Sequence, residues 1–130
     1  MDKTLSKYEF TILGSIPSKS NQYNIITKKG ADGKWHGSLK KSDAMDAYEK
    51  RFYLQCPCRG LNLKGYFILT VKVFNESNRK DIDNSFKGIL DCLQSCQVIK
   101  NDRQCTEIHA YKFVDKNNPR VEITITEIEL

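Results

Sequence analysis

The segment that most constrains the fold is residues 66–74, Tyr-Phe-Ile-Leu-Thr-Val-Lys-Val-Phe. Only Thr70 and Lys72 interrupt a run of aliphatic and aromatic residues, and polar residues 75–80 follow it. A short run of β-formers that ends in turn-forming residues predicts a well-buried strand. The remaining elements must therefore cover this strand.

Three further strands and two main helices are expected around it. Residues 8–13 are rich in β-formers, and two later segments alternate or carry regularly spaced apolar residues. Two segments without proline show helical spacing of apolar residues. The predicted strands are 8–13, 66–74, 104–114 and 120–128, and the predicted helices are 40–55 and 84–97. Residues 115–119, Asp-Lys-Asn-Asn-Pro, predict a hairpin turn between the last two strands. The fold class is α+β, a single domain over residues 1–130 with a mixed β-sheet packed with two main helices.

Length and composition agree with one folded domain. The chain has 130 residues, 39% hydrophobic and 28% charged, which is typical of a soluble globular domain. No segment approaches the roughly 18 apolar residues of a membrane span, and the N-terminus lacks the apolar run of a signal peptide. We expect a cytoplasmic protein without membrane contact.

Five cysteines without an export signal indicate free thiols. A zinc site is the alternative, but the spacing of Cys56, Cys58, Cys92, Cys96 and Cys105 contains no Cys-x-x-Cys pair. Small buried apolar residues are the better interpretation.

Positive charge is concentrated in the first half of the chain. The net charge is +5, and residues 1–64 carry 12 basic and 6 acidic side chains. Residues 17–41 form a basic segment with Trp35 and Tyr23 among its lysines. We expect a mobile loop that binds a phosphate backbone, with an aromatic ring available to stack on a base. A solvated surface loop is the alternative. The candidate DNA-binding residues are Lys19, Lys28, Lys29, Lys34, Lys40 and Lys41.

Acidic residues gather around the predicted helix 84–97. Asp83 suits an N-cap, and the spacing of Asp83, Lys87 and Asp91 places them on one helix face. Asp81 precedes the helix and Asp102 precedes the next strand. Asp81, Asp83 and Asp102 therefore lie at the edges of predicted elements, where they can converge. Two or three carboxylates with a substrate phosphate are suitable ligands for Mg²⁺.

Each residue also has a purely structural interpretation. Asp83 caps a helix, Lys87 and Asp91 form an exposed ion pair, and Asp81 lies in a turn. For any one of these residues alone, the structural interpretation is favoured.

The combined pattern resembles the RusA family of Holliday-junction resolvases. Asp81-x-Asp83-Asn84-x-x-Lys87, then Asp91 and Asn101-Asp102, follow that family's motif. The opening Gly-Ser-Ile-Pro-Ser-Lys-Ser-Asn at 14–21 is also similar to the family. The resemblance covers nearly the whole chain. One departure is Asn101, which stands where relatives often have a carboxylate.

The resemblance implies an activity and a role for each matching residue. It implies metal binding by Asp81, Asp83 and Asp102, catalysis by these three with Lys87, and supporting roles for Asp91 and Asn84. The implied cofactor is Mg²⁺, with Mn²⁺ as a possible substitute. The implied reaction is the resolution of Holliday junctions by paired symmetric nicks in DNA recombination and repair, leaving 5′-phosphate and 3′-hydroxyl ends.

A four-way junction has approximate two-fold symmetry, so two matched nicks favour a homodimer, which the resemblance also implies. The expected partner is four-way or other branched DNA. Family members are often phage-borne, which suggests a phage or prophage origin. Three alternatives remain: a branched-DNA-binding protein without catalysis, a fork- or flap-directed nuclease, and an interaction domain that binds no nucleic acid.

Overall fold

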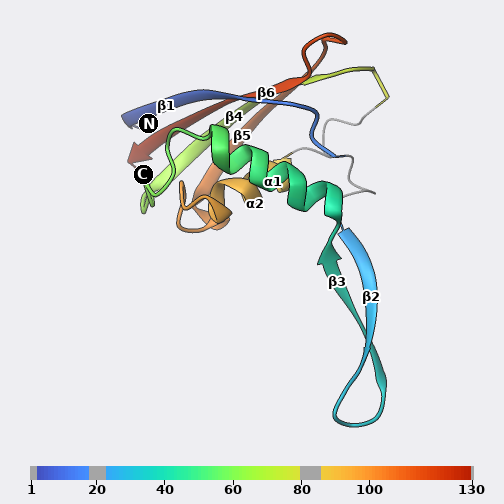
Figure 1. Ribbon diagram of the computed structural model, residues 1–130. Coiled ribbons are helices and arrows are strands. Elements are labelled where there is room, and N and C mark those ends of the chain that lie inside the picture. The colour runs from blue at the N-terminus through green and yellow to red at the C-terminus, as the bar shows by residue number, and fades with distance from the viewer. Residues whose placement is uncertain (1–2, 18–22, 80–85, 130) are drawn as a thin grey trace.

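Four strands form one mixed sheet in the order β1-β6-β4-β5 (Figure 1). The computed structural model describes residues 3–17, 23–79 and 86–129. Strand β6 is antiparallel to both of its neighbours, whereas β5 is parallel to β4. The strands are β1 (Lys3–Leu13), β4 (Tyr66–Asn75), β5 (Cys105–Val114) and β6 (Arg120–Glu129). The α+β class with a mixed sheet is confirmed.

Strand β4 supplies much of the core. Its side chains alternate, and Phe67, Leu69 and Val71 are fully buried on one face. In register beside them lie Ile123 and Ile125 of β6, which are also buried. The prediction of a well-buried strand is confirmed, and β4 lies between two partners.

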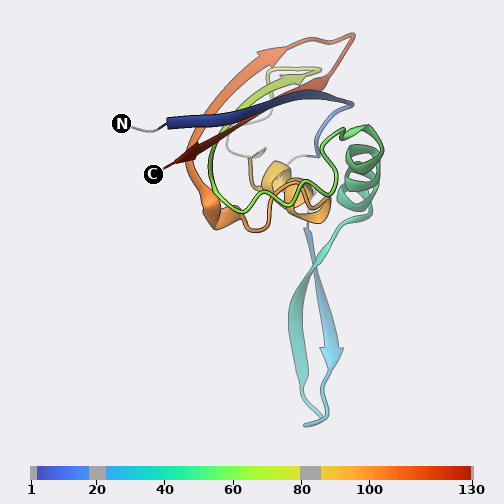
Figure 2. The ribbon, with the colours of Figure 1, turned by 90° about the vertical axis from the view of Figure 1, so that its left-hand side faces the viewer.

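Two helices cover one face of the curved sheet (Figure 2). Helix α1 (Asp43–Gln55) begins after Ser42, whose hydroxyl accepts a hydrogen bond from the Met45 backbone N–H at 3.1 Å. Its buried Phe52 packs edge-on against Phe10 of β1, with ring centroids 6.2 Å apart. Helix α2 (Phe86–Ser95) buries Ile89 and Leu93. A short 3₁₀ turn, η3 (Asp102–Gln104), leads into β5.

The predicted basic loop is instead a β-hairpin, and this expectation was wrong. Strands β2 (Tyr23–Lys29) and β3 (Trp35–Lys41) pair antiparallel as a separate two-stranded sheet. We call residues 23–41 the arm, because it projects away from the body of the molecule (Figures 1 and 2). Tyr23, Ile25, Ile26 and Thr27 are β-formers, and the frequent lysines masked this signal. Lys40 and Lys41 consequently belong to β3 rather than to the first helix.

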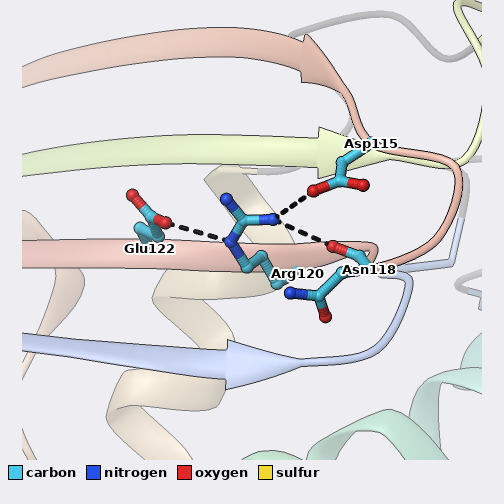
Figure 3. Close-up of polar contacts among 4 residues, drawn as sticks. All are labelled: Asp115, Asn118, Arg120 and Glu122. Atoms are coloured by element: carbon cyan, nitrogen blue, oxygen red, sulfur yellow. Dashed lines mark hydrogen bonds and ion pairs between the residues drawn. The ribbon is translucent and has the colours of Figure 1, made fainter.

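The predicted hairpin at 115–119 is also wrong, because β4 lies between β5 and β6. The turn crosses the end of β4, where the Asp115 N–H donates to the Asn75 carbonyl at 2.8 Å. Arg120 secures this crossing (Figure 3). Its guanidinium donates to Asp115 and Glu122 at 2.7 and 3.0 Å and lies 3.8 Å from the centroid of the Phe74 ring. These contacts hold the connection between β5 and β6 in place of the direct strand pairing that a hairpin would have.

All five cysteines are free, as expected. Cys56, Cys92 and Cys96 are buried, and Cys58 and Cys105 are half-buried. Among the described residues, no three histidine, cysteine, aspartate or glutamate side chains gather closely enough to hold a metal ion. Within the same residues, no helix is long and apolar enough to cross a membrane.

Candidate active site

The exposed face of α2 presents a lysine beside a carboxylate. Lys87 and Asp91 are one helical turn apart, and Lys87 Nζ lies 3.8 Å from Asp91 Oδ1. The lysine side chain is 71% exposed and the aspartate side chain 22% exposed. Asp91 is thus held against the body while the Lys87 ammonium reaches into solvent, where a phosphate can approach it.

A surface pocket adjoins this pair. Its lining residues are Lys41, Lys87, Asp91, Gln94 and Ser95. Lys41 Nζ lies 2.7 Å from Glu49 Oε1 of α1. The hydrogen bond with Glu49 raises the pKa of Lys41, and the charge of Asp91 adds to this effect. The base of the arm therefore contributes a firmly protonated lysine to the pocket wall.

Asp102 is placed by a capped 3₁₀ turn. The Asn101 side chain accepts from the Arg103 N–H at 3.0 Å, and Gln104 Oε1 accepts from the Asn101 N–H at 2.6 Å. Gln104 Nε2 donates to the Leu63 carbonyl at 2.9 Å. These bonds fix the turn, and the Asp102 side chain projects from it into solvent. Asn101, the departure from the family motif, thus serves as a cap.

The Asp102 N–H donates to Gln94 Oε1 at 3.3 Å, so Asp102 lies beside the last turn of α2. Gln94 is eight residues after Phe86, which corresponds to about 12 Å along the helix axis. Asp81, Asp83 and Asn84 lie outside the described residues. The structure therefore places Lys87, Asp91 and Asp102 of the predicted set.

A contact missed by sequence reasoning lies where β4 ends and the chain continues toward the acidic motif. The Ser15 hydroxyl donates to a Glu76 carboxylate oxygen, and the Gly14 N–H donates to the Pro119 carbonyl at 2.9 Å. The segment after β1 is thereby held against the end of β4. No sequence spacing links these residues.

The candidate DNA-binding lysines divide between the arm and the body. Lys28, Lys29, Lys34 and Lys40 are exposed on the arm. Lys41 is half-buried and paired with Glu49. Lys19 lies outside the described residues.

The fold and this site define a class of protein. An exposed lysine with neighbouring carboxylates, next to a projecting basic arm, is suited to the chemistry of a polyanionic phosphodiester. The chain matches the family model "Endodeoxyribonuclease RusA" over residues 16–126 and belongs to the RusA family.

Two curated relatives agree with this assignment. The crossover junction endodeoxyribonuclease RusA of Aquifex aeolicus (strain VF5) is 38% identical over 47 residues, which is 36% of this chain and 37% of the relative. The protein of the same name from Enterobacteria phage HK97 is 37% identical over 54 residues, 42% of this chain and 45% of the relative. The chain thus aligns with less than half the length of either relative.

Proposed function

We propose that this protein is a divalent-metal-dependent endodeoxyribonuclease that resolves four-way DNA junctions by paired symmetric nicks. The family match over residues 16–126 carries the proposal, because it spans the acidic motif, Lys87 and Asp102. Both relatives are named crossover junction endodeoxyribonucleases. The domain proposed for this activity is the whole of residues 1–130. The phage relative favours a phage or prophage origin, with action in the cytoplasm.

We assign Mg²⁺ binding to Asp81, Asp83 and Asp102, with Mn²⁺ as a substitute. Carboxylate oxygens are the ligands that these hard cations prefer, and the described member of the set, Asp102, is exposed on a fixed turn. When bound, the cation supplies Lewis-acid activation of the phosphate. Asp102 lies beside Gln94, at the end of α2 opposite to Phe86. Its participation in the same ion site as Asp81 and Asp83 is therefore the part of this assignment that most needs a test.

Lys87 is assigned the neutralisation of charge on the reacting phosphate. Its exposed ammonium can approach a bound phosphodiester, and Asp91 at 3.8 Å orients it. Asp91 therefore acts as a positioning residue, and Asn84 is assigned a supporting role beside Asp83. Lys41 adds positive charge to the same pocket.

The arm is assigned the binding of the DNA backbone. It carries five lysines and a single aspartate within residues 23–41, and four of those lysines are exposed. Lys19 is assigned to the same surface. Lysine contacts to phosphates bind without reading sequence, so affinity for the junction is expected to fall steeply with salt.

A homodimer supplies the two active sites that paired nicks require. Strand β5 offers a surface for it, because it is an edge strand with exposed Ile108, Tyr111 and Phe113. Antiparallel pairing with the β5 of a second copy, about an axis perpendicular to the sheet, leaves the helices of both copies on the same side. Both sites then face one junction.

Light scattering tests this surface. Ile108→Lys is expected to give monomers, whereas Leu54→Lys, at an exposed apolar residue on α1, is expected to leave the dimer intact. A dimer that persists in Ile108→Lys would place the interface elsewhere.

Cleavage of a synthetic mobile four-way junction tests the activity. We expect symmetric nicks with Mg²⁺ and none with EDTA, and we expect Asp83→Asn to bind the junction without cutting it. Asp43→Asn, on the exposed first turn of α1, is the matched control with full activity. Equal cleavage of forks or flaps would indicate a different substrate, and full nicking by Asp83→Asn would overturn the site.

Metal binding to the protein without DNA tests whether Asp83 and Asp102 bind the same ion. Titration with Mn²⁺ is expected to show weakened binding in both Asp83→Asn and Asp102→Asn. Unchanged Mn²⁺ affinity in Asp102→Asn would remove that residue from the ion site.

A further inference from the structure

The tip of the arm is a structured turn that presents one aromatic ring. The Gly30 N–H donates to the Lys34 carbonyl at 2.8 Å, and Gly33 adopts a φ of +78° within the turn. Asp32 accepts from the Lys34 N–H at 2.9 Å and lies 3.2 Å from His36 Nε2. These contacts lower the pKa of Asp32, with the Lys34 N–H as the largest cause. Trp35 follows this turn directly as the first residue of β3.

Trp35 is largely exposed to solvent. The residue is 68% exposed, and in the register of the arm it stands opposite Lys29 and two residues before Gly37. Among the described residues, no other aromatic ring stacks on it and no cation lies over its face. No helix or second sheet covers the outer part of the arm (Figures 1 and 2). Within the described residues, most of the Trp35 surface is therefore accessible to a partner.

An isolated two-stranded hairpin is marginally stable in water. A large ring that stays mostly exposed at its tip is available for a partner outside the chain to bury. The nearby lysines favour one kind of partner. Lys29 stands opposite Trp35, Lys28 and Lys34 are close to it in the hairpin, and Asp32 is the sole acidic residue of residues 23–41. A second copy of the arm would be repelled, whereas nucleic acid is attracted.

We propose that Trp35 stacks on an exposed base of branched DNA while the neighbouring lysines bind the flanking phosphates. This inference rests on the proposed function, since branched DNA is the substrate assigned there. A two-stranded ribbon is narrow enough to enter a DNA groove, and bases at a branch point expose faces that the continuous stack of a duplex covers. Every base has a π-face, so the contact is independent of sequence.

Trp35 is the chain's sole tryptophan, so its fluorescence reports on this contact alone. The whole protein is titrated in EDTA, where no cleavage occurs, with a four-way junction, a single strand and a linear duplex of equal length. We expect strong quenching by the junction and the single strand and weak quenching by the duplex. Binding is measured in parallel by gel shift.

Substitution measures the strength of the contact. Stacking is worth about 1–3 kcal/mol per base, so Trp35→Ala is expected to weaken junction binding by about 5- to 150-fold. Trp35→Phe is expected to restore most of the affinity, and Leu54→Ala, at an exposed residue of α1, is expected to change nothing. Because the arm lies outside the core, the thermal midpoint of Trp35→Ala should equal that of the parent protein.

The outcomes separate this inference from the function on which it rests. Junction binding without quenching, or equal quenching by the duplex, would overturn the base contact and leave the nuclease assignment standing. A blue shift that depends on protein concentration without DNA would indicate a second copy as the partner. Absence of any junction binding in the gel shift would overturn both.

Discussion

Removing the outer part of the arm should abolish much of the DNA affinity and leave the fold intact. Residues 27–37 can be replaced by Asn-Gly, because Ile26 and Ser38 are paired across the hairpin and a two-residue turn closes such a pair. Strands β2 and β3 form a sheet of their own, separate from the four-stranded sheet. The free energy of unfolding is therefore expected to stay within about 0.5 kcal/mol of the parent value.

The magnitude of the loss follows from the lysines that are removed. The excised segment contains Lys28, Lys29 and Lys34, all exposed. Each phosphate contact contributes about 0.9 to the slope of log affinity against log salt, so three contacts lower the slope by about 2.7. Between 1 M and 0.1 M salt, the affinity of the parent protein for the junction should therefore rise by roughly 500-fold more than the affinity of the shortened protein. The loss of Trp35 should appear as an additional decrease that salt does not change.

Fluorescence anisotropy with a labelled four-way junction, measured at several salt concentrations in EDTA, gives this slope. The matched variant carries Lys28→Gln, Lys29→Gln and Lys34→Gln in an intact arm and should show the same change of slope without the salt-independent loss. An unchanged slope in both variants would refute the idea that the arm binds phosphates. A large fall in thermal stability would refute the idea that the arm is independent of the core.

Three further predictions concern the body of the molecule. Phe52→Ala should cost about 3–5 kcal/mol in urea unfolding because Phe52 is fully buried, whereas Leu54→Ala, at a 77% exposed residue, should stay within about 0.5 kcal/mol. Gln104→Ala should cost about 1–3 kcal/mol and reduce cleavage, because it removes the hydrogen bonds of this side chain with the Asn101 N–H and with the Leu63 and Gly65 carbonyls and so loosens the turn that carries Asp102; equal nicking rates would refute the second part. Arg120→Ala should lower the thermal midpoint at pH 7. The Arg120 guanidinium lowers the pKa of Asp115, so its stabilisation is present above the ordinary aspartate pKa of about 3.9 and is lost as the pH falls through the lowered value. The difference between parent and variant should therefore shrink in acid.

Patterns local in sequence predicted the core well. Residues 66–74 formed the buried strand β4, and residues 84–97, predicted to be helical from their apolar spacing, contain α2, which buries Ile89 and Leu93. The first signal is a short continuous run of β-formers, and the second is an apolar repeat of about four residues, which helix geometry converts into one buried face. Neighbouring residues therefore suffice for such elements.

Strand order could not be predicted in the same way. The turn at 115–119 suggested that the last two strands pair, yet β5 pairs with β4 after the crossover through α2. Nothing in those five residues encodes the parallel pairing of β4 with β5. The arm was missed for a different reason, since its lysines suppressed the apolar alternation that identifies a strand.

In the candidate site too, contacts between residues close in sequence could be predicted and contacts between distant residues could not. The approach of Lys87 to Asp91 follows from their i, i+4 spacing and was predicted. The bonds that place Asp102 join it to Gln94 and join Gln104 to Leu63, residues that no spacing rule relates. Such contacts arise only when distant elements pack.

The position of β6 constrains how the chain is made. This strand comes from residues 120–129, yet it lies inside the sheet, paired with β1 on one side and β4 on the other. During synthesis β1 and β4 emerge from the ribosome before β6. The position between them in the sheet stays unfilled until residues 120–129 follow. Nascent chains interrupted before that point lack the strand that joins both halves, so the complete sheet forms only after residues 120–129 have been synthesised.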